Sequence, residues 1–463
     1  MMPSRRRRHL IRNLGRAVVP AFIGAALLAG GASAGGYAAN LLLQLAAIAL
    51  IYASLLVHPQ SSLPRPGRQL LVLLCLLLAL FAIQVVPLPV GMWAALPGRQ
   101  PVQQGFALLG SPAPWLPLSM TPRNTLASLF WLLPAFAVLL GALRLGAFRA
   151  RWVGWVVIAV ALASVALGAV QLAGGMQSPA YLYRSTNYGV AVGFFANANH
   201  LGTLLLVTIP FLAALLGESV ETQRDRRRAS ALAIALAGAA VVILIGLAIT
   251  GSLAAIGLAV PTAAASVLIA RRSGRGGTPR WALPAVLALG LIALGVVMSQ
   301  PFGNNLTGKG AESQYSRRTS YEVTLAATTH YLPVGSGIGS FVDIYRQQED
   351  PAKVTTTYMN HAHSDLLEIV LETGIPGIVL LALFLLWWGT RAVAVWRAAE
   401  VDRLAQAAVV ASAAVMAHSL VDYPLRTAAI ASLFAFCLAM MAGARERVSG
   451  ERRTDQGARH LSA

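Results

Sequence analysis

The sequence predicts an all-α, multi-pass membrane protein of about twelve transmembrane helices, and both composition and patterning lead to this fold class. Hydrophobic residues make up 57% of the 463 residues and charged residues only 11%, far below the quarter that is usual in soluble domains. The apolar residues gather in runs close to the roughly 20 residues that a helix needs to cross a bilayer. Arginine clusters separate many of these runs. A water-soluble fold is therefore not expected.

Twelve apolar runs approach the length of a membrane span. They centre near Leu27, Ile48, Leu77, Ala135, Val160, Thr208, Val241, Val260, Leu289, Leu380, Ala413 and Ala435. The first run follows a basic leader and ends in Ala32-Ser33-Ala34, which also resembles the cleavage site of a signal peptide, although small residues are common in membrane helices. The later spans keep their orientation in either case.

The placement of the basic residues predicts the topology. Basic residues outnumber acidic residues 36 to 17, and all except Lys309 and Lys353 are arginine. A nucleic-acid-binding protein would gather them on a soluble face, so no nucleic acid partner is expected. By the positive-inside rule their clusters mark cytoplasmic connections and two cytoplasmic termini. The clusters are Arg5 to Arg8 with Arg12 and Arg16; Arg65 and Arg68; Arg144, Arg149 and Arg151; Arg224 and Arg226 to Arg228; Arg271, Arg272, Arg275 and Arg280; Arg391, Arg397 and Arg403; and Arg445, Arg447, Arg452, Arg453 and Arg459.

Two regions follow from the spacing of the spans. Residues 1–193 form an N-terminal transmembrane region of about five spans, and residues 194–463 form a second region with one large outward loop, residues 300–363. This loop is rich in charged and aromatic residues, which favours a functional segment over a disordered one. A shorter outward segment, Gly91 to Arg123, is rich in Pro and Gly with few charges, and we expect an ordered but irregular surface loop there.

The acidic residues are poorly placed for an ion-driven carrier, which normally has Asp or Glu in mid-membrane facing a cavity. The deepest, Glu368, Glu372 and Asp422, lie within about two turns of an outward helix end. A proton- or sodium-driven transporter is therefore disfavoured. The polar residues converge on the outward side instead.

The strongest candidate site is the Asn-His-Ala-His-Ser-Asp segment at residues 360–365, which opens the tenth span. Asp365 and Glu368 have the spacing of a capping box, so Ser364 or Asp365 should cap the helix with His363 just outside it. The positive end of a helix favours a neutral imidazole and a nearby phosphate-like anion. Glycosyl transfer from a pyrophosphate lipid needs both a base and an anion site.

Two simpler interpretations of the histidines stay open. His361 and His363 can be interfacial polar residues that cap a helix. Two histidines at this spacing can also bind a metal, but no cysteine or third histidine lies at ligand spacing.

An arginine pair, Arg317 and Arg318, precedes a glycine-rich turn in the large loop. Arginine suits pyrophosphate because its planar fork binds two oxygens and keeps its charge. The turn permits a close backbone approach to a ligand or a neighbouring helix, but no strand–helix unit surrounds it as a dinucleotide site requires. The simpler alternative for the arginines is a solvated or headgroup-binding cluster. The turn contains Pro333, Gly335, Gly337 and Gly339.

Two further polar groups lie at outward turns. At the start of the sixth span, Asn199, His200 and the preceding Arg184 are candidates to line a donor or acceptor cavity, although asparagines at a helix start are most often caps. Between the last two spans an Asp–Arg pair would hold the turn. That group comprises His418, Asp422, Tyr423 and Arg426.

Together these motifs resemble the O-antigen ligase and polymerase family of bacterial membrane proteins. The family combines a loop arginine, a Pro- and Gly-containing turn, a His-[Asn/Ser]-x-x-Leu motif and Glu-x-Gly-x-x-Gly around one large periplasmic loop. The matching residues are Arg317; Pro333 with Gly335, Gly337 and Gly339; His363 to Leu367; Glu372 to Gly377; Phe195 to Asn199; and His418 to Asp422.

The resemblance implies a GT-C-type glycosyltransferase of the bacterial inner membrane that uses no metal and no nucleotide cofactor. Its donor would be a glycan on undecaprenyl pyrophosphate, and its acceptor a periplasmic hydroxyl, on lipid A-core in a ligase. His363 would be the general base or would orient the acceptor, and Arg317 or Arg318 would grip the pyrophosphate. His361 would also contact substrate.

The chain departs from the family at one position. Members often carry Arg directly after Ser between the seventh and eighth spans, where this chain has Ser252-Leu253. A second pyrophosphate-binding arginine must then come from elsewhere, with Arg184 and Arg346 as candidates, or the donor is bound differently.

Two other functions remain as alternatives. An O-antigen or exopolysaccharide polymerase uses the same motifs, with another lipid-linked repeat as acceptor. A non-catalytic exporter of lipid or polysaccharide predicts charged residues along a transmembrane path, which are missing, and tolerance of the loss of His363.

Overall fold

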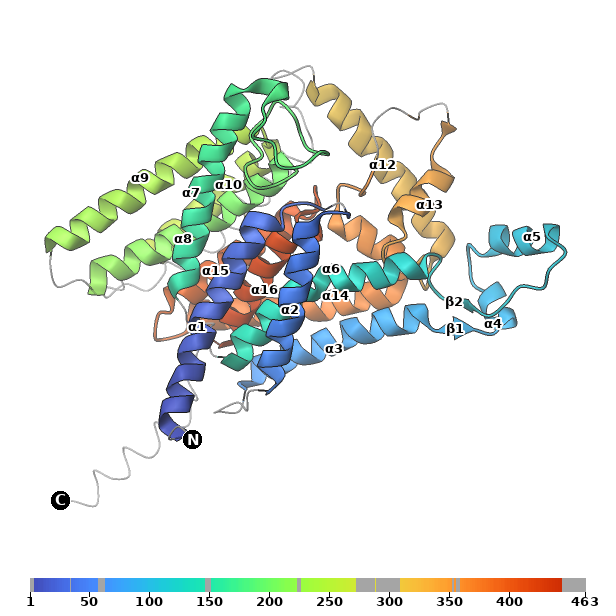
Figure 1. Cartoon of the computed structure of the whole chain (residues 1–463), viewed down its shortest axis with the longest axis horizontal. Coiled ribbons are helices and arrows are strands. Elements are labelled where there is room, and N and C mark those ends of the chain that lie inside the picture. Colours follow the sequence, from blue (N-terminus) through green and yellow to red (C-terminus); the bar gives the residue numbers. More distant parts are fainter. Residues whose placement is uncertain are drawn as a thin grey trace.

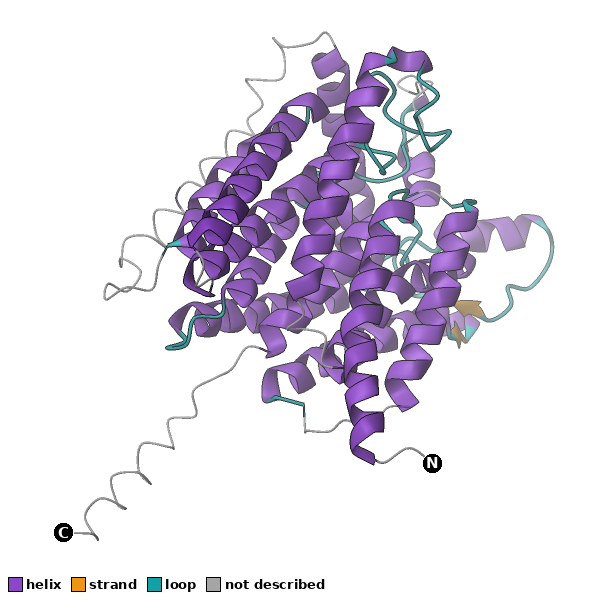
Figure 2. Cartoon of the chain, turned by 60° about the vertical axis from the view of Figure 1, so that its left-hand side comes forward, coloured by secondary structure: helices purple, strands orange, loops and turns teal. Residues whose placement is uncertain are grey.

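The computed structural model is a helical bundle in which the long helices cross one another in several directions (Figure 1). It describes residues 4–33, 35–56, 63–145, 151–222, 226–271, 288, 309–351, 354 and 359–443, without the side chains of residues 4–16, 219–222, 226 and 309–317. Within these ranges the only strands are β1 (Pro87–Leu88) and β2 (Leu116–Pro117), which pair antiparallel (Figure 2).

The long helices are α1 (Ser4–Ala29), α2 (Ala38–Leu56), α3 (Arg65–Val85), α6 (Pro122–Leu145), α7 (Arg151–Ala173), α8 (Ala198–Thr222), α9 (Arg226–Thr250), α10 (Leu253–Ala270), α12 (Lys309–Tyr331), α14 (Asp365–Arg397), α15 (Arg403–His418) and α16 (Ala428–Gly443). Shorter elements are α4 (Val90–Ala94), α5 (Gln100–Leu108), α13 (Phe341–Gln348) and the single turns η2 (Gly175–Gln177) and η4 (Pro424–Arg426).

Eight of the described helices are long and apolar enough to cross a membrane: α2, α3, α6, α7, α8, α9, α10 and α14. Residues Ala17–Ala29 of α1, and α16, are shorter apolar helices. Every predicted span centre lies in a helix except Leu289, which falls outside the described residues. The all-helical fold with several candidate spans is thus confirmed. The count of twelve spans and the GT-C likeness stay predictions.

One apolar core joins the first and the last helices of the chain. The central helix α8 packs against α7, α9, α10 and α15, while α16 packs against α1 and α6. Ile23 of α1, Phe211 of α8 and Phe436 of α16 are fully buried in this core. The two regions 1–193 and 194–463 therefore share one core.

Several helix ends meet on one side of the bundle. The carbonyl of Gly30, after α1, accepts from Ala429 N at 3.1 Å, so α1 and α16 run in opposite directions. The carbonyl of Gly31 accepts from Ala196 N just before α8. The carbonyl of Ser419 after α15 accepts from Asp365 N at 2.9 Å. We call this end, where α8, α14 and α16 begin, the polar end.

Two of the arginines that we assigned to topology are also buried structural groups. Arg403 donates to the carbonyl oxygens of Ile269 and Arg271 at 3.1 and 3.2 Å, and Arg391 donates to that of Met441 at 3.0 Å. Cations are favourable at helix C-termini, whose last carbonyls have no partner within the helix. These side chains therefore stabilise the ends of α10 and α16.

The segment Gly91 to Arg123, which we expected to be ordered but irregular, contains regular structure. It contains most of α4 and all of α5, framed by the β1–β2 ribbon. Trp93 Nε1 donates to the carbonyl of Pro117 at 2.8 Å, and Arg99 donates to that of Leu118 at 2.6 Å. The prediction of irregular structure was wrong, because single Pro and Gly residues indicate turns but do not show which side-chain hydrogen bonds connect one turn to another.

Candidate functional site

Helix α14 is two helices joined by a kink at Gly374, whose φ of 58° and ψ of −146° are not helical. Such a conformation is open to glycine because it has no Cβ, and a Cβ here would lie 2.2 Å from the carbonyl oxygen of Pro333. The first half, residues 365–373, carries Asp365, Glu368 and Glu372, and all three are buried. The kink therefore separates a short acidic helix at the polar end from the apolar second half.

The glycine-rich turn holds this kink. Ile375 N donates to Pro333 O at 2.8 Å, Ser336 N to Leu371 O at 3.0 Å, and Gly337 N to Glu372 O at 2.9 Å. Backbone groups that the kink releases from the helix are thus satisfied by the turn. We considered a ligand or a neighbouring helix as the partner of this turn. In the structure the turn packs against a helix, α14.

His363 precedes α14 in a left-handed conformation, with a φ of 56°. Of the two candidate caps, Ser364 is the N-cap and its hydroxyl accepts from Leu367 N, so Asp365 and Glu368 do not form the capping box that their spacing suggested. Tyr321 on α12 donates to the carbonyl of His363 at 2.9 Å, and Ser320 donates to that of Ala362 at 3.3 Å. Positive φ at a residue other than glycine is uncommon and concentrates at functional sites. Helix α12 therefore helps to fix this backbone.

Asp422 lies between two histidines. Its Oδ1 is 3.5 Å from His363 Nδ1, and its Oδ2 is 3.8 Å from His200 Nε2. Asp422 and His200 are fully buried, whereas the His363 side chain is 22% exposed. A carboxylate beside one ring nitrogen orients an imidazole and stabilises its protonated form. The exposed part of His363 leaves the ring accessible to a substrate.

The ring of Tyr423 packs against three histidines. His361, His200 and His363 lie 4.4, 5.0 and 5.2 Å from it between ring centroids. The buried Tyr423 hydroxyl accepts from Asn197 Nδ2 at 3.3 Å and donates to Asn360 Oδ1 at 3.5 Å. One side chain thus joins the start of α8, the His361–His363 loop and the turn after α15.

Arg426 pairs with three carboxylates and not with Asp422, so the Asp–Arg pair that we expected at this turn is replaced by a larger network. Its guanidinium lies 3.4 Å from Asp365 Oδ1, 3.5 Å from Glu368 Oε2 and 3.3 Å from Glu372 Oε2. Glu368 also contacts His361 Nδ1 at 2.9 Å. A buried charge needs such partners because its desolvation is costly.

The electrostatics of the turn between α15 and α16 follow from burial and charge. Burial alone would raise the pKa of Asp422, but its contact with His363 and the charges of the neighbouring histidines outweigh burial and hold this pKa below its ordinary value. Burial and the charge of Asp422 raise the pKa of Tyr423. Burial would lower the pKa of Arg426, but Glu368, Glu372 and Asp365 raise it. Asp422 is therefore a carboxylate and Arg426 a cation at neutral pH.

The predicted residues are brought together only in part. His363, His361 and His200 meet around Tyr423, and Asn199 lies beside His200 at the start of α8. Arg184 and Arg346 are exposed, and Arg318 is exposed and pairs with Glu322 at 2.9 Å. Arg317 lies within α12, but its side chain is outside the described part of the structure.

The contacts of several site residues were not predicted from the sequence, and Thr203 was not singled out there at all. Asn360, Ser320, Tyr321 and Thr203 are ordinary polar residues whose importance comes from contacts over long sequence distances. Thr203 Oγ1, for example, lies 2.9 Å from the Nδ1 of the buried His418. The sequence signal that pointed to this part of the site was the clustering of His418, Asp422, Tyr423 and Arg426 in one short turn.

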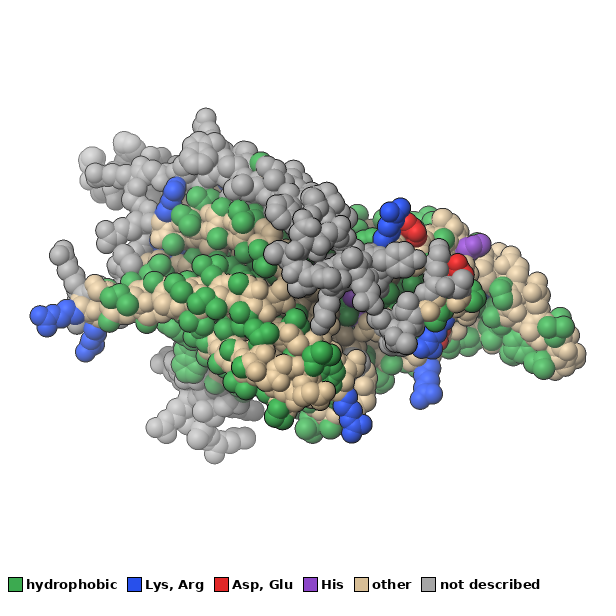
Figure 3. All heavy atoms as spheres, turned by 90° about the horizontal axis from the view of Figure 1, so that it is seen from above, with side chains coloured by type: hydrophobic (Ala, Val, Ile, Leu, Met, Phe, Trp, Pro, Cys, Tyr) green, Lys and Arg blue, Asp and Glu red, His purple; other side chains and the backbone are tan. Residues whose placement is uncertain are grey.

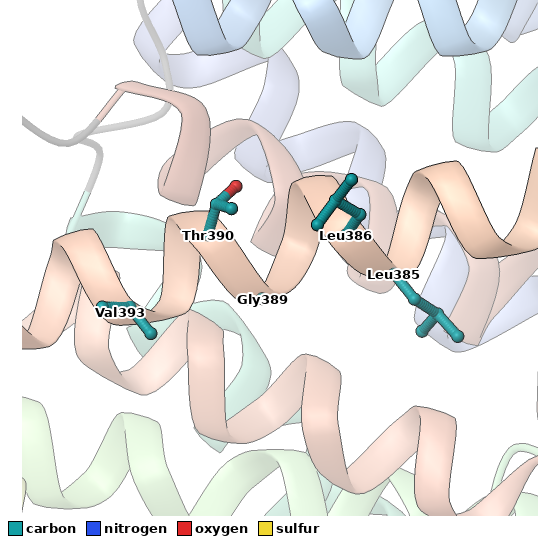
Figure 4. A pocket seen from close by; sticks show the side chains of 5 residues that line it. All are labelled: Leu385, Leu386, Gly389, Thr390 and Val393. Atoms are coloured by element: carbon teal, nitrogen blue, oxygen red, sulfur yellow. The ribbon is translucent and has the colours of Figure 1, made fainter.

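A hollow on the second half of α14 is not the candidate site. Leu385, Leu386, Gly389, Thr390 and Val393 line it, and all belong to one helix (Figure 4). At about 1.5 Å rise per residue, the middle of the hollow lies roughly 40 Å along the helix from His363. Among the described residues, no group of three or more His, Cys, Asp or Glu side chains is arranged to hold a metal ion.

Comparison with known families agrees with the resemblance carried by the motifs. A family model described as O-antigen ligase matches residues 238–382, which include α10, α12, α13, the glycine-rich turn, His363 and the kink of α14. No curated protein matches the chain. With its several apolar helices, the chain is a multi-pass membrane protein, and its residues 238–382 are similar to the O-antigen ligase family.

Proposed function

We propose that the protein transfers a glycan from undecaprenyl pyrophosphate to an acceptor hydroxyl at the periplasmic face of the bacterial inner membrane, with lipid A-core as the acceptor. The observation that carries this proposal is the placement of His363, partly exposed at the start of α14, with Asp422 3.5 Å from its Nδ1. A base beside a helix N-terminus suits a reaction that removes a proton from a hydroxyl and releases a pyrophosphate.

In the proposed reaction, His363 accepts the proton of the acceptor hydroxyl as the oxygen attacks the anomeric carbon of the donor sugar. The bond between this carbon and the pyrophosphate oxygen breaks, and undecaprenyl pyrophosphate leaves with the bonding electrons. Asp422 orients the imidazole and stabilises the imidazolium that forms. General-base catalysis of this kind typically contributes a factor of about 10² to 10⁴ in rate.

We assign the pyrophosphate to Arg317 in preference to Arg318. Position 317 lies three and four residues before Ser320 and Tyr321, so it shares the face of α12 that contacts the His363 loop. Arg318 is turned toward solvent, where it pairs with Glu322. Arg184 and Arg346 stay candidates for a second phosphate contact. The positive end of the helix dipole at the start of α14 also favours a pyrophosphate nearby.

The test is glycan transfer by the purified protein in detergent, using a lipid-pyrophosphate oligosaccharide and, in separate reactions, lipid A-core or a second lipid-linked oligosaccharide. His363→Ala is compared with His330→Ala, which removes an exposed histidine at the end of α12. We expect His363→Ala to lose at least 10²-fold in rate and His330→Ala to retain activity, both remaining folded.

Each result bears on a different part of the proposal. A folded His363→Ala variant with full activity would refute the catalytic assignment. Transfer to lipid A-core supports the ligase reaction, whereas transfer only to the second oligosaccharide identifies a polymerase. If the wild-type protein transfers no glycan to either acceptor, the proposed donor or reaction is wrong.

A further inference from the structure

The segment from Val86 to Pro122 carries apolar side chains that project away from the bundle. It links the end of α3 to the start of α6, which are both candidate membrane spans. Leu108 is 89% exposed and Leu109 is 77% exposed, with Met92 and Trp115 also well exposed. We call these four residues the apolar tip. Figure 1 shows α5 at one extremity of the molecule.

The surface of this segment carries almost no charge. From Val86 to Pro122 the sequence has no Asp, Glu or Lys, and its single arginine, Arg99, is fully buried. Figure 3 shows this end of the molecule without basic or acidic side chains on the visible face. Surfaces that bind proteins in water usually surround an apolar centre with a polar rim. An exposed apolar surface without charges fits contact with lipid better, because charged groups are costly there.

The apolar tip also continues a surface that already faces outward along a candidate span. Only 17% of the most apolar stretch of α3 is buried inside the protein. Leu76 and Ile83 are exposed on it, and Val86 extends the exposed apolar surface beyond the end of the helix. In a membrane-spanning helix such side chains contact lipid. The lipid-facing surface of α3 therefore runs directly into the segment that bears the tip.

The hydrogen bonds of Arg99 attach the base of the segment to the rest of the protein. Arg99 donates to the carbonyls of Pro97, Leu118 and Gly335 at 3.1, 2.6 and 3.3 Å. Its guanidinium also lies over the rings of Trp93 and Tyr331. Because these contacts fix the base of the segment, the exposure of Leu108 and Leu109 belongs to an ordered arrangement.

We propose that the apolar tip inserts into the outward leaflet of the membrane, at the boundary between headgroups and acyl chains, and anchors segment 86–122 there. Trp115 fits this depth because indole combines an apolar ring with a polar N–H. Through Arg99 and Gly335 the anchor is joined to the turn that holds the α14 kink. Docking of a second copy or of another protein predicts a different environment for the tip.

Spin labelling in proteoliposomes tests the proposal without requiring any activity. A nitroxide is attached at Leu108→Cys in a Cys75→Ala background, since Cys75 is exposed and Cys437 is buried. The matched control is Glu322→Cys, whose native side chain is 62% exposed on α12. Collision of each label is measured with oxygen, which concentrates in lipid, and with a water-soluble nickel chelate.

We expect the label at residue 108 to collide with oxygen several-fold more often than with the nickel chelate, and the label at residue 322 to show the reverse. Equal access of both labels to nickel places the tip in water and overturns the proposal. Protection from both reagents also overturns it. In that case, spin–spin broadening that disappears on dilution with unlabelled protein identifies a second copy, and its absence places the tip against the chain itself. Because no glycan is present, the result is independent of the proposed reaction.

Discussion

The hydroxyl of Tyr321 donates a hydrogen bond of 2.9 Å to the carbonyl oxygen of His363, so a side chain on α12 fixes the backbone that presents the proposed base. Tyr321→Phe keeps the ring and removes this bond. A typical hydrogen bond contributes about 0.5–1.5 kcal/mol, so we expect a loss of roughly 2- to 12-fold in transfer rate with little change in melting temperature. Rates are measured at saturating donor, with the exposed Tyr52→Phe as control. A rate equal to wild type would show that α12 does not position His363.

Asp422 should act as a carboxylate across the working pH range. Its pKa is lowered in the folded protein, so its stabilising effect is present above the ordinary aspartate pKa of about 3.9 and is lost only as the pH falls through the lower folded value. Asp422→Asn should therefore reduce transfer at pH 8, where Asp422 is ionised in the wild type. Wild-type rates for the folded variant at pH 8 would show that the carboxylate neither orients His363 nor stabilises its imidazolium.

Removing the charge of Arg426 should destabilise the polar end. Arg426→Met keeps much of the side-chain volume but leaves Asp365, Glu368 and Glu372 buried without their cation. Breaking a buried ion pair by removing one partner typically costs about 3–5 kcal/mol. We expect a large drop in melting temperature in detergent and a smaller one for Arg426→Lys, which keeps the charge. Equal stability of Arg426→Met and wild type would argue against the network.

Gly335 should not tolerate a side chain. Its φ is 83°, and a Cβ would lie 2.6 Å from the carbonyl oxygen of Glu372. Gly335→Ala should therefore loosen the turn against α14 and lower the melting temperature. Gly105→Ala is the matched control, because a Cβ there meets no atom within 4 Å and alanine favours a helix. Equal melting temperatures for the two variants would contradict the close packing at Gly335.

The two loop arginines should differ in donor binding. We expect Arg317→Ala to raise the KM for the lipid-pyrophosphate donor at least tenfold, and Arg318→Ala, whose side chain pairs with Glu322 in solvent, to change it less than threefold. Donor titrations at fixed acceptor measure both. A larger defect in Arg318→Ala would reverse the assignment of the pyrophosphate.

The long apolar helices could be predicted from the sequence because membrane spans are defined by length and apolarity, which are local properties. Helices α5, α12 and α13 were not predicted, since they lie in segments that we expected to be loops. Short-range patterns limited the helix cap to Ser364 or Asp365 and the neighbour of the glycine-rich turn to a ligand or a helix, and the structure selects Ser364 and a helix. The partners of Arg426 could not be predicted, since three carboxylates on one helix face and an arginine in a later turn meet only after the helices pack. The same holds for Tyr423, whose hydroxyl joins Asn197 and Asn360.

The kink at Gly374 has a consequence for how the protein fits membranes of different thickness. A continuous helix that changes its tilt to match a bilayer carries its ends with it. In α14, the second half, residues 375–397, meets the first half at a glycine, and the first half is held by Arg426 and by the turn at residues 333–339. Because the same turn also binds Ile375 N, a change of tilt has to be taken up by the apolar half beyond Ile375, while Glu368 and His363 keep their positions. The proposed chemistry is thereby insulated from variation in lipid chain length.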